Sequence, residues 1–217
     1  PLNILPGGDD FIVIDKPAGL RSIPARGWQD DPARKDSVEI RAQDMFSVYD
    51  CPIIVHRLDM DTSGIMVVAL NRHAHRALSR QFMQRKTAKT YTAQLLGSVE
   101  HDEGAVDLPL LVDWPNRPRQ IVDHEQGKHA KTLWRRLAHE TLDGRPCTRL
   151  EMTPITGRSH QLRVHAAHEH GLGAPILGDN LYGDETRAPR LLLHASMLEI
   201  NDLETGDRMR FESPAPF

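Results

Sequence analysis

The stretch HRLDMDTSG (residues 56–64) places a histidine, an arginine and two carboxylates directly before the apolar run IMVVAL (residues 65–70). A continuous apolar run of this length is typical of a buried strand. Charged side chains beside such a strand need a reason, because burying an unpaired charge is costly. The end of a strand is also where a side chain can reach a cleft, so Asp59 and Asp61 are both candidates for chemistry.

The two carboxylates differ in how well local structure explains them. Residues 61–64 fit a type I turn, with Asp first and Gly fourth. Asp61 therefore has a structural explanation, whereas Asp59 has none. In an extended segment Arg57 and Asp59 share a face. They form either a local ion pair or a cleft with one nucleophilic acid and one cation.

Length and composition favour a packed globular protein. The 217 residues are 39% hydrophobic and 26% charged, and we expect one catalytic domain over residues 1–217. No apolar run approaches the ~18 residues of a membrane span, and the first residues lack the pattern of a secretory signal. Cys51 and Cys147 lie far apart without metal-type spacing, so we expect a reducing compartment, the cytoplasm.

Charge is distributed unevenly, although the formal net charge is only −3. Residues 62–99 contain no Asp or Glu, and residues 154–168 form a second window without acids. The basic residues of the first window are Arg72, Arg76, Arg80, Arg85, Lys86 and Lys89. This distribution favours a basic face for a polyanion. The alternative is a solvated helix face.

Hydrophobic periodicity predicts a mixture of strands and helices. A helix over residues 72–85 has Asn71 as its cap and Ala74, Leu78 and Phe82 on its inner face. A second helix follows Asp36, and residues 105–127 are expected to be irregular because of their prolines. The expected strands are 11–14, 51–55, 64–70, 89–97, 131–140, 147–155, 190–200 and 208–213. This order lacks strict βαβ alternation, so it predicts an α+β fold with a mixed, largely antiparallel sheet.

A third helix is expected over residues 159–171, preceded by TGR, with Thr156 or Ser159 as its cap. Its two arginines and several histidines make it too polar for an ordinary core helix. Arg163 could hold a buried carboxylate ionised and oriented. The alternative is an arginine that contacts phosphate or faces solvent.

Two further patterns have competing interpretations. His165, His168 and His170 invite a metal site, but no Cys or Asp stands at ligand spacing and the HExxH order is absent. We therefore expect no metal. Tyr91 lies in a predicted strand and is either a core residue or, with basic residues on both sides, a platform for stacking on a base.

Ordered motifs along nearly the whole chain resemble one family, the RluA-type pseudouridine synthases. They are DKPAGL, HRLDMDTSG, KTYTA, TGRSHQLRVH, PILGDNLYG and RLLLHA. The resemblance implies the pseudouridine synthase fold: a mixed, mainly antiparallel sheet with flanking helices and a central catalytic cleft. It implies neither cofactor nor metal, and no S4-type RNA-binding domain. The chain departs from the family pattern at residues 166–175, where it is longer and has Ala174 in place of a common histidine.

The resemblance also implies roles for single residues. Asp59 matches the catalytic aspartate, Arg57 the arginine that enters the RNA stack, and Tyr91 the tyrosine that stacks on the flipped uracil. Arg163 matches the arginine that pairs with the catalytic carboxylate. The full set of expected RNA-binding residues is His56, Arg57, Arg72, Arg76, Arg80, Lys86, Lys89, Arg158, His160 and Gln161.

The expected function is isomerisation of uridine to pseudouridine in RNA. The resemblance implies a tRNA anticodon stem-loop site (position 32 in tRNA counting) and a site in 23S rRNA. We expect a monomer without an obligatory protein partner or membrane contact. Two alternatives stay open: a non-catalytic RNA-binding or ribosome-assembly module on the same fold, and a metal-dependent hydrolase that uses the histidine cluster.

Overall fold

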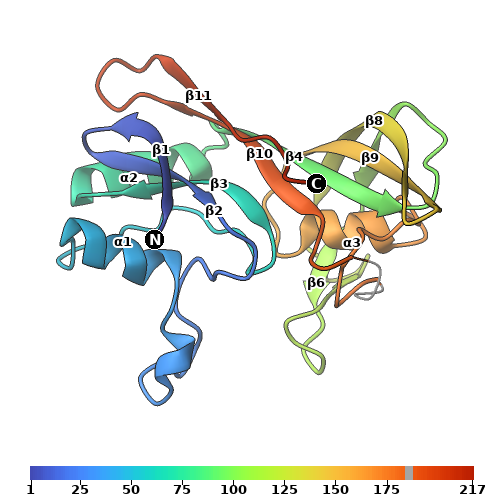
Figure 1. Cartoon of the computed structure of the whole chain (residues 1–217), viewed down its shortest axis with the longest axis horizontal. Helices are drawn as coiled ribbons and strands as arrows, with labels where there is room; N and C mark the ends of the chain where they lie inside the picture. The colour runs from blue at the N-terminus through green and yellow to red at the C-terminus, as the bar shows by residue number, and fades with distance from the viewer. Residues whose placement is uncertain (184–187) are drawn as a thin grey trace. The chain divides into compact units, whose positions relative to one another are not determined.

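The apolar run after HRLDMDTSG forms β3 (Ser63–Ala69), in which every residue is buried. In this computed structural model, which describes residues 1–183 and 188–217, β3 pairs antiparallel with β2 (Phe11–Lys16). The register runs from Phe11 opposite Ala69 to Lys16 opposite Gly64. The predicted central strand is therefore confirmed (Figure 1).

The chain forms two compact units. Unit 1 comprises Pro1–Lys89 and Ala195–Pro216, and unit 2 comprises Thr90–His194 and Phe217. The sheet of unit 1 has the order β1 (Asn3–Gly8), β2, β3 and then β10 (Leu193–Asn201), with β11 (Arg208–Glu212) pairing β10. The β1–β2, β2–β3 and β10–β11 pairs are antiparallel.

The helices of unit 1 are α1 (Val38–Phe46) and α2 (Arg72–Met83), with a short 3-10 helix η1 (Pro32–Arg34). The side chain of Asn71 accepts a hydrogen bond from the Ala74 N–H and caps α2, as predicted. The predicted inner face is also confirmed, because Ala74 and Leu78 are fully buried and Phe82 is partly buried.

Unit 2 is built on the antiparallel sheet β4–β9–β8–β5. Its strands are β4 (Ala88–Leu96), β9 (Arg145–Pro154), β8 (Lys131–Leu142) and β5 (Glu103–Asp107). The predicted pairing of β8 with β9 is confirmed. One face packs into a core that includes Leu95, Leu150, Met152 and Leu162, the last from α3 (Gln161–Ala167).

The prediction that residues 105–127 are irregular was wrong. The region contains the end of β5 and a two-stranded hairpin of β6 (Leu110–Val112) and β7 (Gln120–Val122), which extends away from the rest of unit 2 in Figure 1. Each strand is three residues long and the prolines stand outside both. A strand this short carries too little periodicity to be detected.

Two other predictions also need correction. Residues 51–55 form no strand; only Ile54 makes an isolated bridge, to Val68. Neither Thr156 nor Ser159 caps α3, which follows His160 in a left-handed conformation without a side-chain cap.

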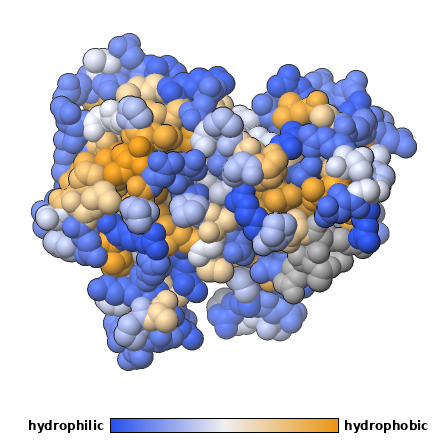
Figure 2. All heavy atoms as spheres, in the orientation of Figure 1, coloured by the Kyte–Doolittle hydropathy of each residue, from blue (hydrophilic) through white to orange (hydrophobic). Residues whose placement is uncertain are grey.

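The fold is mixed α+β with a mostly antiparallel sheet, as predicted. Figure 2 shows mainly hydrophilic side chains on the loop that projects from unit 1 around η1. Within the two ranges that the structure describes, no helix combines the length and apolar character needed to cross a membrane.

Gly64 is fixed by a close approach within unit 1. Its φ is +114°, and a Cβ atom there would lie 2.3 Å from the carbonyl oxygen of Ala195 in β10. Gly206 also has a positive φ, +77°, but a Cβ there would meet nothing within 4 Å. We expect Gly206→Ala to lower the free energy of unfolding by about 1–2 kcal/mol, the cost of the conformation alone.

Gly64→Ala should lose about 1–3 kcal/mol more, because overpacking adds to that cost. Urea denaturation of the two variants measures the difference. Equal losses would show that the approach of Ala195 does not constrain Gly64.

Candidate active site

Asp59 is the first residue of a turn that directly precedes β3. The Thr62 N–H donates to the Asp59 carbonyl at 3.2 Å, so the turn spans residues 59–62. The predicted turn over residues 61–64 was wrong, because Ser63 and Gly64 already belong to β3. Asp59 holds the first turn position, which Asp favours. The preference of Asp for the first turn position, which was assigned to Asp61, therefore explains the backbone position of Asp59. The Asp59 side chain is half-buried.

A buried lysine holds the residue after Asp59. Lys16, at the end of β2, is fully buried, and its Nζ donates to the carbonyls of Pro17 at 2.9 Å, Leu20 at 2.7 Å and Met60 at 2.9 Å. The Met60 carbonyl also accepts the Gly19 N–H at 2.9 Å. These bonds fix the Met60 peptide against the segment that follows β2.

Ser22 holds the residue before Asp59. Its Oγ donates to the Leu58 carbonyl at 2.7 Å and accepts the Leu58 N–H at 3.1 Å. Residues 16–22 therefore clamp both neighbours of Asp59. Lys16 and Ser22 were not predicted from the sequence, although the charged residue at the end of the apolar strand FIVIDK was a signal for Lys16.

Burial alternates along the segment before the turn. Leu58 is buried at 6% exposure, while Arg57 is exposed and Asp59 half-buried. This alternation agrees with an extended segment in which Arg57 and Asp59 share a face. The wedge role of Arg57 in RNA stays a prediction.

His56 has a structural role, and its expected contact with RNA stays a prediction. Its Nε2 accepts the Val67 N–H at 3.0 Å, and its ring stacks on Phe82 with centroids 4.4 Å apart. Burial, together with the nearby charge of Lys89, lowers the pKa of His56 to about 3. A neutral ring whose Nε2 is already an acceptor is poorly suited to holding phosphate.

Arg163 is buried on α3 and bound within unit 2. Its Nε and Nη2 donate to the two carboxylate oxygens of Asp179 at 2.8 and 2.6 Å, and Nη2 also contacts Asn180 Oδ1 at 3.0 Å. The expectation of a buried arginine that orients a carboxylate is thus met by Asp179. Asp179 was not predicted as a site residue, although it lies in the motif PILGDNLYG.

Asp179 is ionised despite its burial. Burial raises its pKa, but hydrogen bonds and charge from Arg163, with the N–H groups of Leu181 and Tyr182, outweigh burial and lower the pKa below its ordinary value. A guanidinium carries five N–H donors, which are enough to bind two carboxylates. The pairing of Arg163 with Asp59, which lies in unit 1, stays a prediction.

Gln161 does not fit the expected RNA-binding set. Its Oε1 accepts from Thr156 Oγ1 at 2.7 Å and the Arg158 N–H at 3.1 Å, while its Nε2 donates to the Lys131 carbonyl at 2.9 Å and Thr132 Oγ1 at 3.0 Å. These four bonds use the full capacity of the buried amide. Gln161 therefore fixes the start of α3 to β8.

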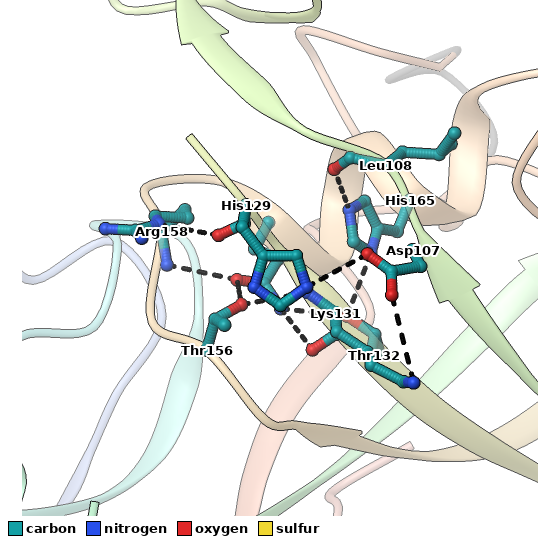
Figure 3. A network of polar contacts seen from close by, with 9 residues as sticks. Asp107, Leu108, His129, Lys131, Thr132, Thr156, Arg158 and His165 are labelled. Carbon is teal, nitrogen blue, oxygen red and sulfur yellow. Dashed lines mark hydrogen bonds and ion pairs between the residues drawn. The ribbon is translucent and has the colours of Figure 1, made fainter. Parts of the chain in front are cut away.

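His165 is part of the same buried network, shown in Figure 3. Its Nδ1 contacts Thr132 Oγ1 at 2.9 Å and its Nε2 the Leu108 carbonyl at 3.1 Å, so both ring nitrogens have protein partners. Burial lowers the pKa of His165 and keeps the ring neutral. No group of three or more metal-ligating side chains occurs among the residues described, and these contacts argue against a metal ligand at His165.

The side chains of Arg158 and His160 reach the protein surface. Arg158 Nε donates to the His129 carbonyl at 3.0 Å, and His129 Nε2 contacts Asp107 Oδ1 at 3.1 Å (Figure 3). His160 Nδ1 contacts the Tyr182 hydroxyl at 2.8 Å. Both residues are half-exposed, so their contact with RNA stays a prediction.

The basic row on α2 faces solvent. Arg72, Arg76 and Arg80 are exposed, as is Lys86 beyond the helix, and Arg72 Nη2 donates to the Asp50 carbonyl. Lys89 differs, because it is half-buried and burial lowers its pKa. The exposed basic residues fit phosphate binding, which stays a prediction. Lys89 is not part of this exposed row.

Tyr91 lies on β4 opposite Met152 and packs partly against the core of unit 2. Its stacking role stays a prediction. Asp59 belongs to unit 1, while Tyr91 and Arg163 belong to unit 2. The catalytic cleft that would unite them also stays a prediction.

Comparison with known proteins shows which proteins this chain is similar to. Residues 10–168 match the family described as RNA pseudouridylate synthase. A dual-specificity RNA pseudouridine synthase RluA from Yersinia pestis is 47% identical over 210 residues, covering 95% of this chain and 96% of that protein. Its namesake from Escherichia coli K12 is 47% identical over 219 residues, covering 100% and 94%.

Solved structures agree with the sequence relatives. Human RNA Pseudouridylate Synthase Domain Containing 1 superposes with a TM-score of 0.80 at 28% identity, covering 100% of this chain and 84% of that one. Human RNA Pseudouridylate Synthase Domain Containing 4 gives a TM-score of 0.72 at 26% identity, covering 99% and 88%.

The low pKa of His56 has a measurable consequence for stability. Because its pKa is lowered from 6.5 to about 3, folding excludes a proton that the unfolded chain binds. At pH values above 6.5 the excluded proton does not reduce the free energy of unfolding. As pH falls from 6.5 toward about 3, the free energy of unfolding decreases by up to about 1.4 kcal/mol per pH unit. His56→Gln keeps an acceptor for the Val67 N–H and cannot titrate.

We therefore expect the free energy of unfolding to fall less steeply with decreasing pH in His56→Gln than in the wild type. Urea denaturation between pH 7 and pH 4 measures both slopes. Parallel curves would mean that His56 titrates normally in the folded protein.

Proposed function

The chain belongs to the RNA pseudouridylate synthase family, and on that basis we propose that it isomerises uridines in tRNA and 23S rRNA with Asp59 as its catalytic carboxylate. It is therefore an isomerase. The observation that carries the proposal is the 42–47% identity, over nearly the full length, to curated dual-specificity RNA pseudouridine synthases.

The reaction requires few chemical groups. The N1–C1′ glycosidic bond of uridine breaks, the uracil turns and a C5–C1′ bond forms, while the C5 proton leaves to solvent and N1 takes up a proton in its place. No electron or phosphoryl group is transferred, so one ionised carboxylate that attacks or stabilises the sugar or base is sufficient. Asp59 supplies this carboxylate, and Tyr91 is a candidate acceptor for the C5 proton.

The clamp on the Asp59 backbone supports this assignment. Lys16 and Ser22 fix the peptides on both sides of Asp59 through neutral carbonyl and amide groups. A fixed backbone limits the conformations of the Asp59 side chain, and positioning of this kind can supply a large part of a rate enhancement.

Arg163 orients the Asp59 carboxylate in this proposal. Arg163 is already charge-balanced by Asp179. If it contacts both carboxylates, the three groups carry a net negative charge, which suits a carboxylate that must stabilise an electron-poor sugar carbon.

RNA binding and base flipping are shared among other residues. Extrusion of a base costs a few kcal/mol of lost stacking. Arg57 fills the gap in the RNA stack, and Tyr91 stacks on the flipped uracil at about 1–3 kcal/mol. The exposed arginines of α2 hold phosphates, which position RNA without reading its sequence.

The finer proposals concern substrate and setting. We place the target uridines in a tRNA anticodon stem-loop, at position 32, and in 23S rRNA. The names of the two bacterial relatives support dual specificity. The cytoplasm suits an RNA substrate and two cysteines that are both free thiols. One chain carries all three predicted catalytic residues, so we propose a monomer that needs no protein partner.

Substitution of the two aspartates tests the assignment. Release of tritium from RNA labelled at uridine C5 reports the loss of the C5 proton. We expect Asp59→Asn to abolish release, since the amide is neither nucleophilic nor charged. Asp61→Asn, two residues away and similarly half-buried, should retain most activity.

Both variants should still bind RNA. Unchanged release by Asp59→Asn would contradict the site assignment. No release by the wild type on any RNA, with binding intact, would favour the alternative of a non-catalytic RNA-binding module. Full activity in EDTA would rule out the metal-dependent hydrolase.

A further inference from the structure

Tyr182 is a half-buried tyrosine of unit 2 that lies beside Arg163 and has no role in the reaction as proposed so far. The guanidinium carbon of Arg163 lies 5.4 Å from the centre of the Tyr182 ring. A cation at this distance is attracted by the face of an aromatic ring. Because Arg163 is only 3% exposed, water screens this attraction little. The ring is therefore a direct support of the guanidinium.

The backbone of Tyr182 also supports the carboxylate that binds Arg163. The N–H groups of Leu181 and Tyr182 donate to Asp179 Oδ1 at 2.9 and 3.0 Å. The same Oδ1 accepts Arg163 Nη2 at 2.6 Å, while Oδ2 accepts Arg163 Nε at 2.8 Å. Asp179 thus holds one edge of the guanidinium, and the Tyr182 ring lies against its plane. Tyr182 contributes to both contacts, through its main chain to the first and its side chain to the second.

The Tyr182 ring is itself held in place. Its hydroxyl accepts the Gln120 N–H, at the start of β7, at 2.7 Å and contacts His160 Nδ1 at 2.8 Å. Burial raises the pKa of Tyr182, so the hydroxyl keeps its proton. The ring also packs against a small apolar cluster, Leu110, Ala130 and Val164. Hydrogen bonds at the hydroxyl and apolar contacts at the ring make Tyr182 a fixed surface.

His160, the partner of the hydroxyl, has an unusual backbone conformation. Its φ is 52°, in the left-handed region that residues other than glycine rarely adopt. It stands directly before α3, the helix that carries Arg163. Its side chain is held by the Tyr182 hydroxyl and by an edge-on ring contact with centroids 5.7 Å apart. Such a conformation persists only where the surroundings fix it. Tyr182 therefore also fixes the start of the helix that bears Arg163.

We propose that Tyr182 is a positioning residue for the isomerisation, which holds the Arg163 guanidinium in the orientation from which it orients Asp59. The inference rests on the proposed function, because only there does Arg163 act on Asp59. An arginine side chain is long and flexible, and a guanidinium bound along one edge still tilts about that edge. The Tyr182 ring removes this freedom. Tyr182 acts through Arg163 and touches neither the uracil nor the sugar.

Tritium release from uridine C5 in a single turnover, with RNA affinity measured in parallel, tests the proposal. Tyr182→Leu removes the ring and keeps an apolar side chain. We expect its rate to fall about tenfold or more at unchanged RNA affinity, because small displacements of a catalytic group are costly. Tyr182→Phe keeps the ring and should recover most of the rate. The control is Tyr49→Leu, which removes an exposed ring in unit 1 and should leave the rate unchanged.

Hydrogen exchange of the Arg163 Nε–H, followed by NMR, reports the hold on the guanidinium without any substrate. The signal is assigned by its absence from Arg163→Lys. We expect exchange to be about tenfold faster or more in Tyr182→Leu, because the bond to Asp179 opens locally more often. Tyr182→Phe should exchange as the wild type does. The amide of Leu150, in the core of unit 2, should be unaffected in both variants.

Three results would overturn the inference. A wild-type rate in Tyr182→Leu would show that Arg163 needs no ring, and a weakened RNA affinity at an unchanged rate would make Tyr182 an RNA contact. Faster exchange at Leu150 as well as Arg163 would reduce Tyr182 to a support of the fold.

The design also covers a failure of folding and a failure of the proposed function. If Tyr182→Leu does not fold, Tyr182→Met removes the ring with an unbranched side chain that adapts to the same space. The same outcomes then apply. A wild type that releases no tritium from any RNA would refute the proposed function. An active wild type with an unaffected ring variant would refute the role of Tyr182 alone.

Discussion

The buried ammonium of Lys16 is the constraint on which the arrangement around Asp59 depends. A lysine in an apolar interior is costly unless its donors find acceptors. Here Lys16 Nζ binds the carbonyls of Pro17, Leu20 and Met60, which belong to two segments far apart in sequence. Burial of the charge therefore requires the segment after β2 and the turn before β3 to meet. Asp59 lies in that turn. Its backbone position therefore depends on the hydrogen bonds that Lys16 needs when it is buried.

Unit 2 uses a buried cation in a different way. Arg163 is matched by a full carboxylate, Asp179, in two short charge-assisted hydrogen bonds. Removal of either partner would leave an uncompensated buried charge, which typically costs 3–5 kcal/mol. Lys16 thus positions a neighbouring peptide through neutral acceptors, while the Arg163–Asp179 pair forms a rigid charged element. Each unit fixes its own part of the proposed site before RNA arrives.

The sequence predicted those parts of the fold and site whose causes are local. The apolar run of β3, the Asn71 cap of α2 and the pairing of β8 with β9 follow from nearby residues. The turn beside Asp59 was predicted two residues too late, because the conformation of Gly64 serves the distant Ala195 in β10. Gln161 and His56 were assigned to RNA, yet their side chains bond to β8 and β3. The local sequence pattern does not predict these hydrogen-bond partners, because they are adjacent only in the folded protein.

The most direct test of this account breaks the clamp without touching the carboxylate. Ser22→Ala removes the hydroxyl that bonds both backbone groups of Leu58. Tritium release from uridine C5 is measured in a single turnover, with RNA affinity measured in parallel. If the clamp positions Asp59, the rate should fall about tenfold or more while RNA affinity stays unchanged, because small displacements of a catalytic group are costly. A variant that is less stable but isomerises uridine at the wild-type rate would contradict the account.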